Sequence, residues 1–293
     1  MVPVGAAAVE ILNVSKRFGE VEALQDVTFT IDAGDVVAML GPNGAGKTTS
    51  ISIMLGTRQP TTGQVSLFGM PPRDLKARRR IGVMLQESGV PGMLKVTEIV
   101  ELFGSYYPAP VPAARAIAMA GLEEKANSLV KDLSGGQRQR LYFALAVCGN
   151  PDVLFLDEPT VGMDVEGRRR LIEEIANLAA QGRTVVFTTH YLEEADLLAR
   201  RVIVIDRGRI IADSTPAEIK SRVAGKRITF TTTQRLPEGL PLTGAQVEGT
   251  RVRLLTNEPE RVLRELFGHG VEMHDLEVSG ADLEEAFVAM THR

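Results

Sequence analysis

Apolar and polar positions alternate along the first part of the chain, from Val9 to Ile31, with a break at FGE (18–20). A period of two is typical of strands that bury one face, and the break predicts two antiparallel strands. The run DVVAML (35–40) is apolar without alternation, which indicates a strand buried on both faces. It leads into a glycine-rich segment and then into a helix that we expect from about Lys47 to Leu55.

The apolar period changes in the middle of the chain. Two further strands are predicted at 63–69 and 79–87, and from 97 to 133 the pattern becomes helical. The prolines of YYPAPVPA (106–113) interrupt this pattern, because a proline ends one helix and is tolerated at the start of the next. We therefore expect a helical insert at about residues 90–150.

A strand, a helix and a second strand follow the insert. The run DVLFLDEP (152–159) is apolar and ends in two carboxylates, the next helix is amphipathic and closes at Gly182, and TVVFTT leads to His190. Buried strands that alternate with a helix predict a parallel α/β sheet. A hairpin at 201–214 and a capped helix at 215–225 complete this part of the chain.

The pattern differs after Gly225, where short strand-like runs are separated by a loop with Pro and Gly and by two helical segments. At 293 residues the chain is long enough for one large domain and one small one. We expect a first domain at 1–225 and a small α+β domain at 226–293.

The segment between the first buried strand and its helix has the spacing of a phosphate loop. It matches G-x-x-x-x-G-K-[ST]. The loop consists of Gly41, Pro42, Asn43, Gly44, Ala45, Gly46, Lys47, Thr48 and Thr49. Glycines let backbone N–H groups point at an anion, Lys47 pairs with the terminal phosphates, and the Thr48 hydroxyl ligates Mg²⁺. The match predicts a nucleoside triphosphate site without choosing among kinases, GTPases and ATPases.

Two carboxylates, Asp157 and Glu158, end an apolar strand, where charges are costly unless they face a ligand or a metal. We infer that Asp157 holds Mg²⁺ through water and that Glu158 is the general base for the attacking water. The alternative is a strand end that turns to solvent before Pro159.

A second anion-binding helix start stands at LSGGQ (133–137). Ser134 is suited to cap a helix, and Gly135 and Gly136 let the backbone approach an anion closely. The alternative is an ordinary helix cap without a ligand. Because one triphosphate is already held by residues 41–49, we infer that this second site completes the pocket of another copy of the chain.

These motifs, in this order, resemble the ATP-binding subunits of ABC transporters over residues 9–225. The resemblance comprises an A-loop aromatic residue, the Walker A loop, a glutamine after a strand, the signature, the Walker B strand and the switch histidine. In this sequence they fall at Phe18, 41–49, Gln86, 133–137, 153–159 and His190. The fold implied is a P-loop ABC ATPase core of the α/β class, with an antiparallel β subdomain, a helical subdomain and a small C-terminal α+β domain.

The resemblance also implies cofactors, a partner and residue roles. ATP and Mg²⁺ would be bound in a head-to-tail dimer, with each ATP between the Walker A loop of one subunit and the signature of the other. Gln86 would join Thr48 and Asp157 at Mg²⁺ and would sense the water and the membrane partner, while His190 would contact the γ-phosphate. The remaining nucleotide contacts implied are Ser134, Gly135, Gly136, Gln137 and Asp164.

Three positions of the resemblance have alternatives. Phe18 stands where tyrosine is more common, so it would stack on adenine without a hydroxyl, or it is a core phenylalanine. Val161 replaces a small hydroxylic residue in the D-loop, which puts a side-chain hydrogen bond across the dimer in doubt, although Asp164 is retained. His190 is otherwise a structural histidine at a strand end.

Three further segments, LDEPTVGMD (156–164), THYLEEAD (189–196) and LEEAFVAMT (283–291), look similar to the ATPases of the ABC-2 exporter group, which includes daunorubicin-resistance-type drug exporters. This similarity implies a peripheral subunit at the cytoplasmic face of the bacterial plasma membrane. It would energise a separate transmembrane permease that exports a drug, lipid or other hydrophobic compound.

Two alternatives are an importer ATPase and an ABC ATPase that acts on ribosomes or DNA. The role of the tail is either dimer contact or regulation.

Charge and composition limit the kinds of binding partner that we expect. The chain has 33 basic and 37 acidic side chains, so its net charge of -4 provides no global basic field for nucleic acid or anionic lipid. We expect no nucleic-acid partner and contact with the membrane only through the permease. The basic runs at 73–80 and 167–171 are either solvated helix faces or contacts to a partner. No segment has the roughly 20 apolar residues that a membrane-spanning helix requires.

The single cysteine and three of the histidines are interpreted as structural. Cys148 lies in an apolar run, so we expect a buried thiol, and one cysteine excludes an intrachain disulfide and fits a reducing compartment. His269, His274 and His292 lack the spacing of metal ligands.

Overall fold

The structure is a computed structural model, and it describes residues 6–85, 89–221, 226–234, 236, 245–256, 258–280 and 282–291. The chain forms two compact units, Met1–Ser214 and Thr215–Arg293. We had expected the boundary at Gly225. The helix α8 (Pro216–Ser221) instead groups with the second unit, because it packs against α10 (Leu283–Thr291).

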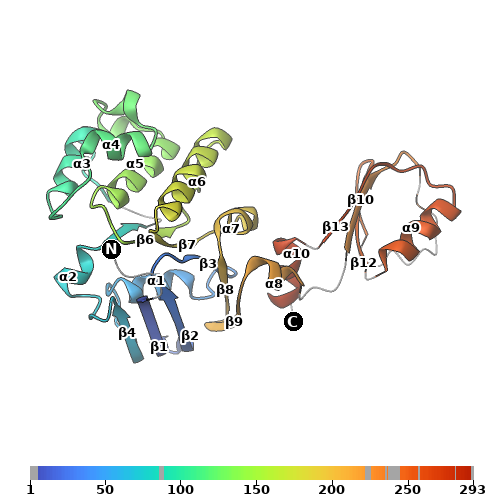
Figure 1. The fold of residues 1–293 in the computed structure, drawn as a ribbon, viewed down its shortest axis with the longest axis horizontal. Helices are drawn as coiled ribbons and strands as arrows, with labels where there is room; N and C mark the ends of the chain where they lie inside the picture. Colours follow the sequence, from blue (N-terminus) through green and yellow to red (C-terminus); the bar gives the residue numbers. More distant parts are fainter. Residues whose placement is uncertain are drawn as a thin grey trace. The chain divides into compact units, whose positions relative to one another are not determined.

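A six-stranded sheet forms the centre of the first unit (Figure 1). Its order is β5-β6-β7-β3-β8-β9, with parallel neighbours except for the antiparallel hairpin of β8 and β9. Its strands are β3 (Val36–Leu40), β5 (Ile81–Met84), β6 (Val153–Asp157), β7 (Thr184–Thr188), β8 (Arg201–Asp206) and β9 (Arg209–Ser214). Every residue of β3, β6 and β7 is buried. Their apolar runs are continuous because both faces of these strands are covered.

A second sheet of three antiparallel strands, in the order β2-β1-β4, lies on one side of this centre. Its strands are β1 (Ala7–Phe18), β2 (Val21–Asp32) and β4 (Thr62–Leu67), and α1 (Lys47–Met54) lies beside them. Side chains of both sheets and of α1 share one core, which includes Ile11, Ile51 and Phe155. The antiparallel pair expected from the alternation at 9–31 is therefore present.

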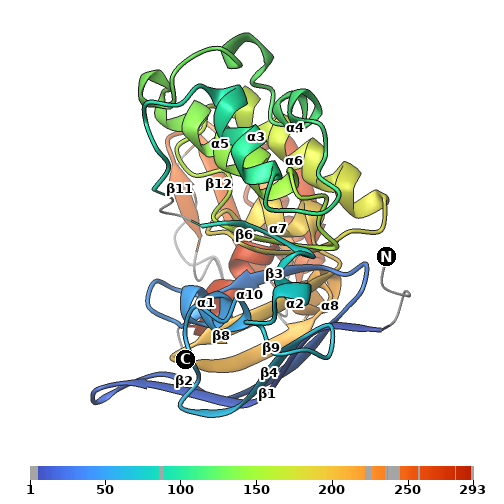
Figure 2. The same ribbon diagram turned by 90° about the vertical axis from the view of Figure 1, so that its left-hand side faces the viewer.

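The helices of the predicted insert lie on the opposite side of the six-stranded sheet (Figures 1 and 2). The elements here are α3 (Val96–Gly104), α4 (Ala113–Met119), the 3₁₀ turns Glu123–Lys125 and Val130–Asp132, and α5 (Gly135–Val147). The short helix α2 (Leu75–Arg78) precedes the insert, and its Ala77 belongs to the core shared by the two sheets. Pro112 precedes α4 directly, as expected for a proline at a helix start. The helix α5 packs against β5, which holds the insert on the sheet.

Cys148 ends α5 and is fully buried, as expected. Its Sγ donates a hydrogen bond to the carbonyl of Leu145 at 3.1 Å. Burial raises the pKa of the Cys148 thiol to about 11. A thiol with this pKa is an unreactive packing group at neutral pH.

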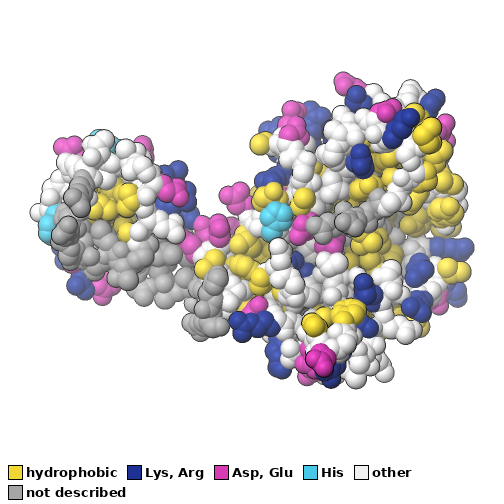
Figure 3. All heavy atoms as spheres, turned by 180° about the vertical axis from the view of Figure 1, so that it is seen from behind, with side chains coloured by type: hydrophobic (Ala, Val, Ile, Leu, Met, Phe, Trp, Pro, Cys, Tyr) yellow, Lys and Arg dark blue, Asp and Glu magenta, His cyan; other side chains and the backbone are white. Residues whose placement is uncertain are grey.

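The helices α6 (Val165–Ala180) and α7 (Leu192–Leu198) complete the first unit. The basic residues of α6 are paired within the chain. Arg170 and Arg169 form ion pairs with Glu166 and Glu173 along α6. In the earlier basic run, Arg80 pairs with Asp152 at 2.7 Å. On the face drawn in Figure 3, Lys and Arg side chains are interspersed with Asp and Glu. These pairs favour the interpretation of the basic runs as ordinary surface.

The second unit contains a four-stranded antiparallel sheet in the order β11-β12-β10-β13. Its strands are β10 (Lys226–Thr231), β11 (Gln246–Glu248), β12 (Arg251–Thr256) and β13 (His274–Gly280), and α9 (Pro259–Gly268) lies between β12 and β13 in sequence. A small core joins the sheet to α9 through Ile228, Phe230, Val262 and Leu266. Of the described helices in either unit, none combines the length and the apolar character needed to cross a membrane.

Candidate active site

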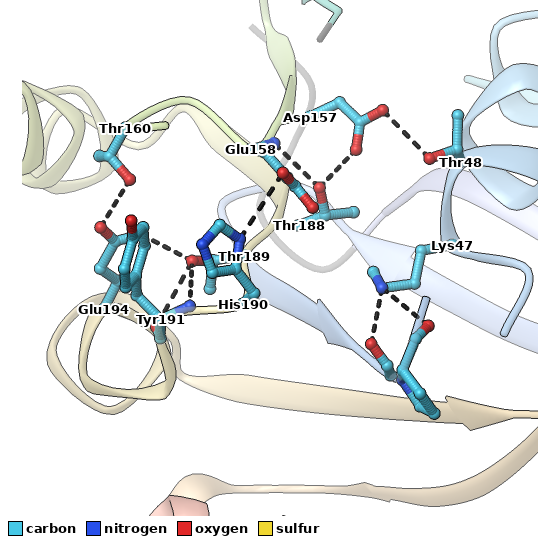
Figure 4. A network of polar contacts seen from close by, with 12 residues as sticks. Lys47, Thr48, Asp157, Glu158, Thr160, Thr188, Thr189, His190, Tyr191 and Glu194 are labelled. Carbon is cyan, nitrogen blue, oxygen red and sulfur yellow. Dashed lines mark hydrogen bonds and ion pairs between the residues drawn. The ribbon is translucent and has the colours of Figure 1, made fainter. Parts of the chain in front are cut away.

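Three sequence motifs meet because their strands are neighbours. The strand β7 pairs with β3 on one side and with β6 on the other, and all three run parallel. Ligands of such sheets bind beyond the carboxyl ends of the strands. The phosphate loop follows β3, Asp157 and Glu158 end β6, and His190 follows β7. Figure 4 shows Lys47, Thr48, Asp157, Glu158 and His190 at this edge.

The phosphate loop is shaped by two glycines that no other residue could replace without movement. Gly46 has a φ of +113°, and a Cβ there would lie 2.7 Å from the carbonyl oxygen of Ala23. A Cβ on Gly41 would lie 2.2 Å from the carbonyl oxygen of Ile205 in β8. The backbone at both positions therefore packs directly against neighbouring backbone, which fixes the path of the loop into α1.

Lys47 begins α1, and its side chain folds over the loop that precedes it. Its Nζ donates to the carbonyl oxygens of Gly41 at 2.6 Å and Pro42 at 3.1 Å. Burial lowers the pKa of the Lys47 ammonium, while the carboxylates of Glu158 and Asp157 oppose this shift. The ammonium is thus held between the loop and the acidic end of β6.

Asp157 is a nearly buried carboxylate, 2% exposed, with hydroxyl partners from two other elements. Its Oδ2 accepts a hydrogen bond from Thr48 Oγ1 of α1 at 3.3 Å, and its Oδ1 accepts a short one from Thr188 Oγ1 of β7. These contacts offset part of the cost of burying the charge. Asp157 therefore does not turn out to solvent, which was the alternative considered for this strand end.

Glu158 lies next to Asp157 in a strained backbone conformation. Its φ is +51°, which is uncommon for a residue with a side chain. Its N–H donates to the hydroxyl and the carbonyl of Thr188, at 3.0 and 3.2 Å. Its side chain points toward His190, whose Nδ1 is 3.6 Å from Glu158 Oε2 (Figure 4). The Glu158 side chain is 15% exposed and the His190 side chain is 49% exposed, so both can be reached from solvent.

The signature segment caps α5 as expected. Ser134 Oγ accepts from the N–H of Gln137 at 3.2 Å, and Gln137 Oε1 accepts from the N–H of Ser134 at 3.0 Å. Ser134 and Gly135 are exposed. Within the described residues, no hydrogen bond or ion pair joins 134–137 to the phosphate loop. The structure thus brings the Walker A and Walker B residues together but not the signature.

The D-loop residues lie beside the signature of the same chain. A Cβ on Gly136 would lie 3.3 Å from the carbonyl oxygen of Gly162. Asp164 caps α6, because its Oδ1 accepts from the N–H of Gly167 at 3.0 Å. One oxygen of its side chain is therefore already hydrogen-bonded at the start of α6.

Phe18 ends β1 and is 39% exposed, so it is not the core phenylalanine considered as the alternative. Lys16 Nζ and the Arg58 guanidinium each lie 5.1 Å from the centre of its ring. Gln86 and His292 lie outside the described residues. His269 and His274 are exposed in the second unit, and His269 Nδ1 is 2.8 Å from the carbonyl oxygen of Glu265.

Thr188, Thr189 and Glu194 take part in the site, but sequence reasoning did not identify them. The Thr188 hydroxyl donates to the Asp157 carboxylate, and the Thr188 hydroxyl and carbonyl oxygens accept from the backbone N–H of Glu158. Glu194 of α7 accepts hydroxyl hydrogen bonds from Thr160 and Thr189, on the loops after β6 and β7 (Figure 4). The available signal was the pair of threonines that ends the apolar strand before His190, where buried hydroxyls need partners.

Comparisons with known proteins agree with this geometry. The family model described as ABC transporter matches residues 24–161. A Nod factor export ATP-binding protein I from Burkholderia lata is 41% identical over 225 residues, which cover 74% of each chain. The daunorubicin resistance ATP-binding protein DrrA3 from Streptomyces coeruleorubidus is 35% identical over 302 residues, which cover 97% of this chain and 96% of that protein.

A solved dimeric ATP-binding cassette, in a post-hydrolysis state with ADP and Pi, has a similar fold. It is 29% identical with a TM-score of 0.65, and the match covers 71% of this chain and 98% of that one. The phosphate loop and the acidic strand end on this sheet define an ATP-hydrolysing nucleotide-binding cassette. The chain belongs to the family of ATP-binding proteins of ABC transporters. Cassettes of this family bind ATP, dimerise and act with separate transmembrane subunits, and the predicted fold class is confirmed.

The two glycines of the loop provide a matched test of this geometry. Gly46→Ala should lower ATP affinity at least about tenfold, because the new Cβ would clash with the Ala23 carbonyl in a conformation that already disfavours a side chain. Gly44→Ala is the control, since Gly44 also has a positive φ, +80°, but nothing lies within 4 Å of its Cβ position. Titration with a fluorescent ATP analogue measures both. Equal losses in the two variants would contradict the packing argument.

Proposed function

We propose that this chain is the ATP-hydrolysing subunit that energises an ABC-2 type exporter through a separate transmembrane permease. The observation that carries the proposal is the group formed by Lys47, Asp157, Glu158 and His190 beyond three adjacent parallel strands. Export is favoured by what the relatives' names state, Nod factor export and daunorubicin resistance. The cargo we expect is a drug, a lipid or another hydrophobic compound.

The residues around Asp157 fit a Mg²⁺ ion bound together with the nucleotide. The nearly buried Asp157 carboxylate and the Thr48 hydroxyl are oxygen donors 3.3 Å apart, and oxygen is the ligand that Mg²⁺ prefers. Thr48 would bind the ion directly and Asp157 would bind it through water, with Gln86 as a further ligand. When bound, the ion neutralises charge on the β- and γ-phosphate oxygens.

The proposed chemistry assigns one role to each polar group near the γ-phosphate. Lys47 exchanges its carbonyl partners for phosphate oxygens, which are stronger acceptors for an ammonium. The Glu158 carboxylate takes the proton of the attacking water as its oxygen bonds to the γ-phosphorus and the bond to the ADP oxygen breaks. His190 donates a hydrogen bond to a γ-phosphate oxygen, and its 3.6 Å contact with Glu158 keeps the two groups on the same side of the reaction.

The adenine base would stack on Phe18. The ring is exposed at the end of β1, with the Lys16 and Arg58 cations beside it, and base–aromatic stacking needs no hydroxyl. The phosphates would then extend from this ring toward the loop at 41–49.

A head-to-tail dimer would complete each nucleotide site. The capped start of α5 is exposed, and a helix start attracts a phosphate through its free N–H groups and its dipole. Residues 134–137 make no polar contact with residues 41–49 of the same chain in the described part of the structure. Ser134, Gly135, Gly136 and Gln137 of one subunit would therefore cover the γ-phosphate held by the other. Asp164, next to the signature, would lie at the same interface.

We expect this assembly at the cytoplasmic face of a bacterial plasma membrane, where the permease carries the cargo. Contact with the membrane would pass through the permease, because acidic and basic side chains balance over the chain. The second unit would act as an accessory or regulatory domain.

The general-base assignment predicts a specific loss. Glu158→Gln should retain ATP affinity within about threefold and lower kcat about 10²–10⁴-fold, because an amide cannot take the proton of water. It should also accumulate as an ATP-bound dimer in size-exclusion chromatography. Glu166→Gln is the matched control, since Glu166 is an exposed carboxylate at the start of α6. Wild-type turnover in the Glu158 variant would remove the assignment.

The shared site predicts that two inactive variants restore each other. Lys47→Ala alone should lose ATP affinity, and Gly135→Asp alone should block the signature by placing a carboxylate beside the γ-phosphate. In a mixed dimer, the intact loop of the second variant would face the intact signature of the first. ATPase assays on the mixture should regain up to about half of the activity per mixed dimer. No recovery in a mixture shown to exchange subunits would exclude a head-to-tail site.

The transport role predicts recruitment to membranes. Co-expression with its transmembrane permease should retain the chain on membranes through a wash at about 1 M salt, which screens nonspecific charge contacts. Without that partner the chain should wash off. Co-purification with ribosomes or DNA would support a non-transport ATPase instead, and a complex that requires a solute-binding protein would support an importer.

A further inference from the structure

A buried carboxylate ties together the two loops that carry the catalytic groups. Glu194 of α7 is 4% exposed, and its two oxygens accept hydrogen bonds from Thr160 Oγ1 at 2.6 Å and Thr189 Oγ1 at 2.8 Å (Figure 4). Thr160 follows β6, and Thr189 follows β7. One side chain therefore fixes two segments that are separate in the sequence.

Both segments carry groups assigned to hydrolysis. Thr160 stands two residues after Glu158, at the start of the D-loop, and Thr189 directly precedes His190. The Thr189 hydroxyl also accepts from the N–H of Tyr191 at 2.9 Å, so hydrogen bonds from both sides of His190 lead to Glu194. A shift of Glu194 would move His190 relative to Glu158.

A second set of contacts closes this arrangement around the Tyr191 ring. The Arg168 guanidinium lies 3.8 Å from the centre of that ring, and Arg168 Nε lies 3.6 Å from Glu194 Oε1. The Tyr191 ring in turn lies 4.1 Å from the His190 ring. The imidazole thus rests on a ring that is held, through Arg168, by the same carboxylate.

The free-energy cost of burying the Glu194 carboxylate indicates that this arrangement does more than fill the core. Burying a carboxylate is unfavourable unless hydrogen bonds and charge partners compensate for it, and Glu194 uses three such partners. All three come from segments next to the reacting groups or from α6, which begins after the D-loop. The loop that Thr160 begins also reaches the signature, through the contact of Gly162 with Gly136.

We propose that Glu194 is a positioning residue for ATP hydrolysis, which holds His190 and the D-loop in register with Glu158 through Thr189 and Thr160. It would touch neither ATP nor the attacking water. The inference rests on the proposed roles of Glu158 and His190 and adds a residue that those roles do not include.

The test compares two neighbouring glutamates. Glu194→Gln keeps the size of the side chain, but its amide leaves one of the two threonine hydroxyls without its acceptor and Arg168 without its charge partner. We expect kcat to fall about 10–100-fold with the ATP Kd within about twofold of wild type, as a small misplacement of a catalytic group predicts. Glu193→Gln is the matched control, because Glu193 is exposed on the same helix. It should leave kcat unchanged.

Substitutions of the threonines keep the test independent of the Glu194 variant. Thr189→Val removes the hydroxyl at nearly constant volume and should lower kcat in the same way, whereas Thr189→Ser keeps the hydroxyl and should restore most of the activity. Thermal unfolding of each variant shows whether a lost kcat reflects lost structure. A Thr189→Val variant that is folded and fully active would overturn the proposal.

A double-mutant cycle separates positioning from a general structural role. If Glu194 acts through His190, Glu194→Gln should lower kcat less than about threefold in a His190→Ala background. An equal loss in both backgrounds, or wild-type kcat in Glu194→Gln, would overturn the inference while the role of His190 stands. Wild-type kcat in His190→Ala alone would remove the role proposed for His190 and the inference with it.

Discussion

The parallel pairing of β7 with both β3 and β6 is the constraint on which the site depends. Three segments that are separate in sequence, the first more than a hundred residues before the other two, end at one edge because their strands share a register. Asp157 and Met39 both lie opposite Thr188. The buried runs of these strands leave little freedom to slip, since a shift by one residue would exchange the two faces of each strand. The phosphate loop, the acidic pair and the switch histidine are therefore positioned by the core.

The charges at this edge are arranged so that each compensates another. Burial lowers the pKa of the Lys47 ammonium, and the carboxylates of Glu158 and Asp157 oppose only part of this shift. Asp157 has hydroxyl partners on both oxygens, and Glu158 is held by backbone contacts to Thr188. A triphosphate would bring negative charge to Lys47 and the loop N–H groups, and Mg²⁺ would bring positive charge to Asp157. Each added charge thus meets a group of opposite sign that the fold already provides.

Local patterns in the sequence were sufficient to predict groups whose role depends on their own segment. The phosphate loop, the acidic end of β6, the cap at Ser134 and the burial of Cys148 belong to this class, because each depends on neighbours a few residues away. Thr188 and Glu194 were missed because their function comes from contacts with other strands and loops. The boundary at Gly225 failed to anticipate the packing of α8 on α10 for the same reason, since α10 lies more than sixty residues later.

The exposed position of the signature fits the proposal that a single subunit presents two helix starts to phosphates, one to its own nucleotide and one to its partner's. The start of α1 is enclosed by its loop and by the acidic end of β6, whereas the start of α5 is capped by its own residues and open to solvent. The D-loop lies against the signature at Gly136 and is tied through Thr160 to the carboxylate that also holds Thr189. When a phosphate of the partner's nucleotide binds at the signature, it would therefore lie next to the D-loop, and this loop is connected to His190 of the same chain. This connection offers a physical route by which closure of one site reaches the catalytic groups of the other, through contacts that are already formed in one subunit.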